Sequence, residues 1–316
     1  MTAPPPPASP PAPPPPPASP PAPPPPPASP PAPPPPPASP PATPPPPAGP
    51  AGVPVGPAGV LALAVQLRLL GVRPRARLLV HASLGGTGLR AAALRDALTG
   101  VLGPHGTLLV PAFTPENSTT SGAHLARIAG LAEEEVRAFR ERMPAFDPAR
   151  TPSQGMGAFA EAVRTAPGAA RSGHPQTSFA ALGKDAERFC AGHRLESHLG
   201  EESPLGKLCW EGGQVLMINV GFSVCTAFHL AEYRMAKPPL RMYECVVKVN
   251  VPGAQRGEGW TAYEDVALDD GDFAEIGRSF PESRVRRGRV GGVSAMLFSL
   301  PDAVDHALDW MTENRR

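Results

Sequence analysis

A buried strand, a glycine-rich turn, an amphipathic helix and a second buried strand follow one another in the first half of the chain. The strands are the apolar runs at residues 77–83 (RLLVHAS) and 106–114 (GTLLVPAFT), and residues 89–103 carry the helical pattern between them. A strand–helix–strand crossover joins parallel strands, because a tight turn cannot connect them. The sequence therefore predicts an α/β fold with a mixed, largely parallel central sheet flanked by helices.

Further elements extend this pattern to the end of the chain. Residues 177–183 and 213–223 have the pattern of strands, and two alternating segments, 242–251 and 289–300, predict a mixed sheet or a small β-layer late in the chain. Helices are expected at residues 59–71, 124–143, 156–168, 184–193, 225–235 and 301–316.

The first 58 residues differ from all that follows. The block PAPPPPPASP repeats three times between residues 11 and 40, and residues 1–50 carry no charge. Such a segment has no apolar periodicity, so we expect a disordered, polyproline-II-like leader and linker over residues 1–58. The length of residues 59–316 suits one large α/β domain or two small ones. A proline-rich ligand for aromatic grooves is the alternative role for the leader, although the repeat lacks flanking basic residues.

Composition narrows the class of protein. Lys and Arg number 29 against 28 Asp and Glu, which argues against nucleic acid as a partner. The sequence has neither an apolar run long enough to span a membrane nor a basic-then-apolar secretory signal, so we expect no membrane partner. The four cysteines form no CxxC pair, and no second Cys/His pair stands at finger spacing. We expect a cytoplasmic protein with free thiols and no metal.

Polar loops follow the three strongest buried strands, at residues 81–88, 114–122 and 221–226. Ligands of open α/β sheets bind beyond the carboxyl ends of the strands, so the site is expected where these loops converge. The glycine-rich turn at 81–88 opens a helix and suits a phosphate, although a plain turn is the commoner explanation.

Two histidine-containing segments are candidates for chemistry. His174 precedes Pro175 in a loop that leads into a strand, where it is either a base near neutral pH or a structural residue. His229 and Glu232 are spaced i, i+3 on the predicted helix, with Cys225 four residues before His229. They are an oriented histidine–carboxylate pair, a Cys–His nucleophile, or a solvated pair. The acidic run at residues 264–272 either attracts a polycation or is a solvated loop.

Taken together and in order, these segments resemble the aminoglycoside 3-N-acetyltransferase family. The resemblance rests on LLVHASLGG, on RSGHPQTSFAALG, on GEESPLGKLCWEGGQVLMINVGFSVCTAFHLAEYR and on the closing GRVGGVSAMLFSLPDAVDHALDWM. It covers nearly all of residues 59–316. It implies acetyl transfer from acetyl-CoA to the 3-amino group of a deoxystreptamine antibiotic. Many relatives carry an acidic or amide residue where Ser223, Val224 and Cys225 stand here, which bears on the range of antibiotics.

The resemblance also implies roles for individual residues. His174 matches the family's histidine before proline and is expected to be the general base, poised by Glu232, with His229 as the next candidate. The Thr226 hydroxyl is expected to help stabilise the oxyanion. The expected coenzyme contacts are His81, Ala82, Ser83, Leu84, Gly85, Thr114 and Ser153, and the expected acceptor contacts are Asp269, Asp270 and Asp272. The alternatives are another small amine as acceptor, or a ping-pong enzyme acetylated on Cys225; a homodimer is the expected assembly.

Overall fold

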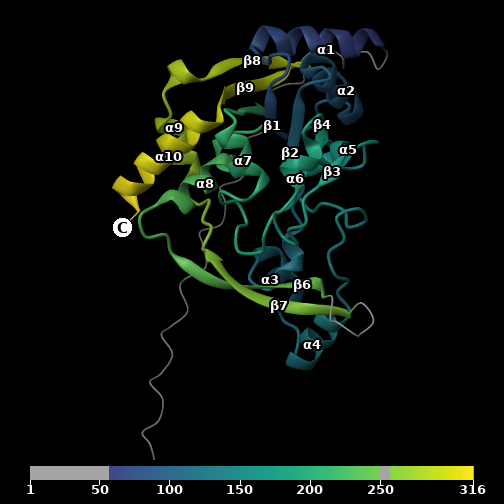
Figure 1. Ribbon diagram of the computed structural model, residues 1–316, viewed down its shortest axis with the longest axis vertical. Helices are drawn as coiled ribbons and strands as arrows, with labels where there is room; N and C mark the ends of the chain where they lie inside the picture. Colours follow the sequence, from purple (N-terminus) through teal and green to yellow (C-terminus); the bar gives the residue numbers. More distant parts are fainter. Residues whose placement is uncertain (1–56, 250–256, 316) are drawn as a thin grey trace, which may run out of the picture. The chain divides into compact units, whose positions relative to one another are not determined.

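A seven-stranded sheet, in the order β3–β4–β2–β1–β5–β9–β8, forms the centre of the fold (Figure 1). The computed structural model describes residues 57–249 and 257–315, so the leader predicted over residues 1–58 lies almost entirely outside the described residues. The strands of this sheet are β1 (Arg77–Ala82), β2 (Thr107–Pro111), β3 (Ala170–Arg171), β4 (Phe179–Gly183), β5 (Gln214–Ile218), β8 (Arg286–Val290) and β9 (Val293–Ser299).

The three central strands are parallel and the outer ones are not. Strand β1 pairs in parallel with β2 on one side and with β5 on the other. The pairings of β2 with β4, β4 with β3, β5 with β9 and β9 with β8 are antiparallel. The predicted mixed sheet with a parallel core is therefore confirmed, and the carboxyl ends of β1, β2 and β5 meet at one edge.

Helices cover both faces of the sheet, because successive side chains of each central strand point to opposite sides. In β1, Leu78 and Val80 pack against one set of helices and Leu79 against the other. The first set is α1 (Pro57–Leu70), α2 (Ala91–Leu102) and α5 (Gly157–Arg164). The second set is α6 (Ala186–Cys190), α7 (Pro204–Trp210), α8 (Ala227–Arg234), α9 (Phe273–Ser279) and α10 (Leu300–Asn314).

A second sheet consists of two antiparallel strands, β6 (Leu240–Val249) and β7 (Gly257–Val266), so a small late β-layer is present as predicted. Of the two segments from which it was predicted, only 242–251 belongs to it, because 289–300 pairs with β5 as part of the main sheet. Figure 1 shows it beside the two helices α3 (Gly122–Ile128) and α4 (Glu133–Glu141). One helix was expected over residues 124–143. The chain forms two instead, because Gly130 adopts a left-handed conformation (φ 78°) that ends the first helix.

No helix in the described ranges has the length and apolar character needed to cross a membrane. The four cysteines, all of which are described, are buried and unpaired, as the sequence predicts.

Candidate active site

The main cavity, of about 710 Å³, opens at the carboxyl ends of β1, β2 and β5. The segment after β1, Pro111 and Phe113 at the end of β2, and the loop after β5 contribute to its wall. Of the three polar loops expected to form the site, the one at residues 114–122 supplies no lining residue. The start of α5 forms a further side. The lining residues include His81, Ala82, Ser83, Leu84, Gly85, Phe113, Met156, Phe159, Val220, Ser223, Val224, Thr226, His229, Asp270 and Phe273.

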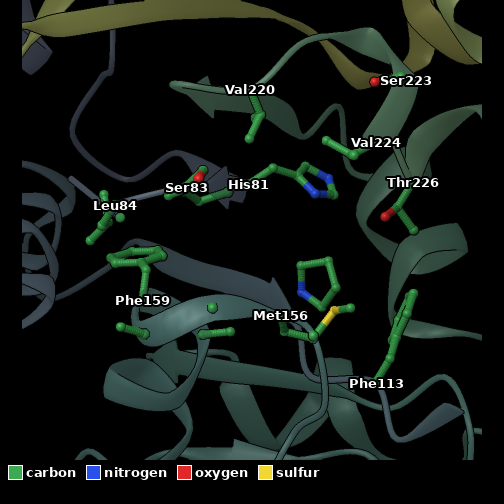
Figure 2. Close-up of a pocket in the computed structure, with 18 of the residues that line it drawn as sticks. His81, Ser83, Leu84, Phe113, Met156, Phe159, Val220, Ser223, Val224 and Thr226 are labelled. Atoms are coloured by element: carbon green, nitrogen blue, oxygen red, sulfur yellow. The ribbon is translucent and has the colours of Figure 1, made fainter. Parts of the chain in front are cut away.

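The residues of the cavity divide by chemistry. Leu84, Met156 and Phe159 give one side an apolar surface, whereas His229 and Asp270 belong to its polar side. Figure 2 shows the apolar group beside the turn that follows β1. A ligand with an apolar arm and a polar reacting end fits this division.

Gly157 lets the chain enter α5 close to the cavity floor. Its φ of 81° is a conformation that side-chain-bearing residues rarely adopt, and a Cβ placed on it would lie 3.5 Å from the carbonyl oxygen of Ala82. The close approach of these two segments brings Met156 into the cavity wall.

His81 projects from the end of β1 into the cavity, and its ring is visible near the middle of Figure 2. The side chain is buried, and its Nε2 has no hydrogen-bond partner in the described part of the chain. Burial lowers the pKa of His81 to about 4, so the ring is neutral at pH 7. This atom is one of the few buried side-chain polar atoms without a partner among the described residues, and it belongs to a residue that lines the cavity.

His229 and Glu232 form a hydrogen-bonded pair one helical turn apart on α8. The His229 Nδ1–H donates to Glu232 Oε2 over 2.7 Å. Glu232 is 1% exposed, while the His229 side chain keeps 14% of its surface exposed and lines the cavity. Because Nδ1 is held by the carboxylate, Nε2 carries the free lone pair of the neutral ring. The pair thus has the geometry of an oriented base.

The other oxygen of Glu232 is held from two directions. Oε1 accepts a hydrogen bond from the backbone N–H of Asp269 at 2.9 Å and another from the Arg315 guanidinium at 2.5 Å. Arg315 also binds both carboxylate oxygens of Asp272, at 2.7 and 2.5 Å. Of the three expected acceptor contacts, only Asp270 lines the cavity, and Asp272 is occupied by Arg315.

Thr226 stands immediately before α8 and lines the cavity. Its hydroxyl caps no backbone N–H of the helix and makes no hydrogen bond with the described residues. Figure 2 shows the hydroxyl pointing into the cavity, toward the side that carries His81. It is free to donate to a bound carbonyl oxygen.

His174 lies away from this cavity and makes no contact with Glu232. It is fully buried, and its Nδ1 accepts hydrogen bonds from the backbone N–H groups of Gln176 (3.1 Å) and Thr177 (3.0 Å). Its Nε2–H donates to the carbonyl of Leu195 at 3.1 Å. Burial, reinforced by two neighbouring histidines, lowers the pKa of His174 well below 6.5. Both nitrogens are occupied, so the surroundings of His174 are those of a structural residue and not of the expected base.

A cluster of buried rings surrounds His174. Its ring centre lies 4.8 Å from that of His193 and 4.4 Å from that of His198. The Nδ1–H of His198 donates to Asp265 over 2.6 Å, and the hydroxyl of Tyr233 donates to the same carboxylate over 2.7 Å. This histidine cluster (His174, His193 and His198) joins the central domain to the small sheet.

Three other candidates fall outside the cavity lining. Thr114 donates its hydroxyl to the carbonyl of Pro175 at 2.7 Å, and Ser153 donates to Glu161 at 2.6 Å, so both are used within the fold. Cys225 is fully buried and precedes α8, which begins at Ala227, so it does not share a helix face with His229. Burial raises the pKa of its thiol to about 12.

Comparison with known proteins identifies the family. The profile of the aminoglycoside 3-N-acetyltransferases matches residues 79–312. This chain belongs to that family. The resemblance seen in the sequence is therefore confirmed.

Relatives match over most of their length. The SPbeta prophage-derived aminoglycoside N(3')-acetyltransferase-like protein YokD of Bacillus subtilis (strain 168) is 35% identical over 254 residues, 78% of this chain and 90% of the relative. Aminoglycoside N(3)-acetyltransferase VII of Streptomyces paromomycinus is 30% identical over 272 residues, 79% of this chain and 90% of that protein.

Solved structures share the fold. The structure described as AAC-IIIb binary with CoASH has a TM-score of 0.68 and 30% identity, covering 80% of this chain and 96% of its own. The structure described as AAC-VIa bound to sisomicin has a TM-score of 0.67 and 29% identity, covering 80% and 97%.

Some residues of the site could not be predicted from the sequence. Arg315 lies near the end of the helix expected over residues 301–316, and nothing in that pattern indicates that it reaches Glu232 across 83 positions of the chain. In the sequence, Met156 and Phe273 look like ordinary apolar core residues. Only the folded structure shows that they line the cavity.

Proposed function

We propose that this protein is an acetyl-CoA-dependent N-acetyltransferase that modifies the 3-amino group of the deoxystreptamine ring of aminoglycosides and so gives resistance to them. Family membership supports this reaction, as do the relatives whose structures are described with CoASH and with sisomicin. The observation that carries the proposal is His229 in the cavity wall, hydrogen-bonded to the buried Glu232.

His229 acts as the general base. The acceptor amine is an ammonium at neutral pH and becomes nucleophilic only after losing a proton. Nε2 of His229 takes that proton, and Glu232 holds the ring in the required tautomer and stabilises the imidazolium. This role passes from His174 to His229, because both nitrogens of His174 are already used in hydrogen bonds.

The turn after β1 binds the coenzyme. Ala82, Ser83, Leu84 and Gly85 line the cavity beside its apolar side, which suits the pantetheine arm of acetyl-CoA. Acetyl-CoA supplies the activated acetyl group as a thioester. The neutral ring of His81 is available as a hydrogen-bond partner for the bound coenzyme.

Thr226 stabilises the charge that develops on the carbonyl oxygen during attack. Its hydroxyl lines the cavity one helical turn before His229 and has no hydrogen-bond partner among the described residues. A donor aimed at developing charge typically contributes ~10²–10³-fold in rate. Asp270, at the exposed rim, attracts the cationic acceptor.

Transfer is direct: the amine attacks the thioester carbonyl, the C–N bond forms as the C–S bond breaks, and the coenzyme A thiolate leaves and takes up a proton. A ping-pong route through Cys225 needs a thiolate in the cavity, whereas this thiol is buried outside the lining residues and has a pKa of about 12. The free thiols favour a reducing compartment, and we place the enzyme in the cytoplasm. Its expected homodimer stays a prediction.

Kinetics of His229→Asn test the proposal. We expect kcat with an aminoglycoside acceptor to fall by ~10²-fold or more, the usual scale of a lost general base, while the KM for acetyl-CoA changes little. The acidic limb of the pH–rate profile should flatten in the variant. His105→Asn, at an exposed histidine, is the matched control. No coenzyme consumption with a panel of aminoglycosides, or a near-normal kcat in His229→Asn, would contradict the proposal.

A further inference from the structure

Arg315 makes more hydrogen bonds to the catalytic side of the cavity than its place in the sequence suggests. Directly after α10, its guanidinium donates to Glu232, to both oxygens of Asp272 and to the backbone carbonyl of Asp269. All four distances lie between 2.5 and 2.7 Å. The side chain is 19% exposed. Arg315 thus connects the partner of the base to the loop between β7 and α9.

The charges at this point are unusual for a histidine–carboxylate pair. Glu232 and Asp272 together carry two negative charges, and Arg315 supplies one positive charge between them. Burial lowers the pKa of the Arg315 guanidinium, but the hydrogen bonds that it donates to Asp272 and Glu232 have the larger combined effect and raise this pKa. Arg315 therefore stays charged. Glu232, Asp272 and Arg315 together carry one net negative charge. When His229 accepts a proton, the four residues together become neutral.

We propose that Arg315 is a positioning residue that sets the basicity of His229 through Glu232 and fixes the Asp269–Asp272 loop at the acceptor side of the cavity. This inference rests on the proposed function for its catalytic meaning. A cation bound to Glu232 competes with the imidazolium for the same carboxylate and so favours the unprotonated form of the ring. Loss of this cation leaves two carboxylates to attract the proton.

The other charged or titratable groups near the pair are His81, Asp270, Asp272 and the buried His198, which interacts electrostatically with His229. His81 at the end of β1 is neutral at pH 7, and its protonated form would oppose a charge on His229. Asp270 lines the cavity from the β7–α9 loop, and Asp272 is bound by Arg315. Within α8 the pair faces only its own members. Arg315 is thus the one fixed cation in direct contact with Glu232 among the described residues.

A titration of His229 tests the inference in the enzyme without substrates. The imidazole is followed by NMR in protein labelled at histidine, and its signal is identified by its loss in His229→Gln. In Arg315→Met we expect the pKa of His229 to rise, because a cation next to its carboxylate partner has been removed. Arg315→Lys keeps the charge and should restore most of the wild-type pKa. Arg278→Met, at an exposed ion pair of α9, is the matched control and should not change it.

Kinetics provide the second readout. In Arg315→Met the acidic limb of the pH–rate profile should move to higher pH by the same amount, and the acceptor KM should rise several-fold while that of acetyl-CoA stays within about twofold. Arg315→Lys should restore the pH profile better than the acceptor KM, because an ammonium cannot bridge Glu232, Asp272 and Asp269 as a planar guanidinium does. A purely structural arginine would lower stability without moving the titration.

Two outcomes decide the inference. An unchanged His229 pKa in folded Arg315→Met overturns it. If Arg315→Met does not fold, Asp272→Asn takes its place: it removes a negative charge and should lower the pKa of His229, and an unchanged or raised value overturns the inference. The titration uses no substrate, so it stands or fails separately from the acceptor assays that test the proposed function.

Discussion

Acid should unfold this protein steeply, and the buried histidines are the reason. Burial lowers the pKa of His193 and of His81 from 6.5 to about 4, and that of His174 falls well below 6.5. Between pH 6.5 and 4 an unfolded chain protonates these rings while the folded protein does not. The stability that they contribute is therefore complete above pH 6.5 and is lost as the pH falls below it.

The expected size follows from the pKa shifts. Each such histidine lowers the free energy of unfolding by about 1.4 kcal/mol for every pH unit below 6.5. From pH 6.5 to 4.5, His193 and His81 together remove roughly 5 kcal/mol, comparable to the whole stability of about 5–15 kcal/mol of a typical domain. Burial raises the pKa of Glu161, but its hydrogen bonds to Arg164 and Ser153 lower it by more, to about 2. The stability that Glu161 contributes is therefore lost only at lower pH.

Urea unfolding at pH 7.5, 6.5, 5.5 and 4.5, followed by circular dichroism, measures this slope. His193→Gln removes one titrating ring, so its slope below pH 6.5 should be smaller than that of the wild type by about 1.4 kcal/mol per pH unit, whatever its stability at pH 7.5. His105→Gln, at an exposed position, should keep the wild-type slope. Equal slopes in His193→Gln and wild type, or a wild type whose stability is flat from pH 7.5 to 5, would refute the reasoning.

Two further predictions concern the binding of acetyl-CoA in the cavity and the alternative ping-pong route. Ser83→Trp places a large ring in the turn after β1, where Ser83 lines the cavity, so the KM for acetyl-CoA should rise about tenfold or more in a protein whose circular dichroism is unchanged. An unaltered coenzyme KM would remove this turn from the binding site. Cys225→Ala should keep kcat within about twofold, and mass spectrometry of wild type incubated with acetyl-CoA alone should detect no acetylated protein, because the Cys225 thiol is buried and protonated at neutral pH. An acetyl adduct on Cys225 would revive the ping-pong route.

The parallel core and the location of the cavity were predictable because both depend on local patterns. Apolar runs that end in polar loops mark the carboxyl ends of β1, β2 and β5, and the cavity lies there. The i, i+3 spacing of His229 and Glu232 likewise reflects helix geometry, and the two side chains are hydrogen-bonded.

The choice between His174 and His229 was not predictable from such patterns. His174 is buried by segments distant in sequence, including Leu195 and His198, and its lone pair is used by the backbone that follows it. Whether a histidine in a loop is open to a ligand depends on these long-range contacts. The same holds for Arg315, whose link to Glu232 exists only in the folded chain.

The wall of the cavity has a consequence for how this enzyme can diversify. In the proposed mechanism, residues 80–160 bind the coenzyme, and residues 220–273 supply the base, the hydroxyl donor and Asp270. Acetyl-CoA and the acceptor amine are thus bound by residues from separate parts of the sequence. On this proposal, substitutions within residues 220–273 can change which amine is accepted without weakening the binding of acetyl-CoA. A change of antibiotic range then requires only a few substitutions in one part of the sequence.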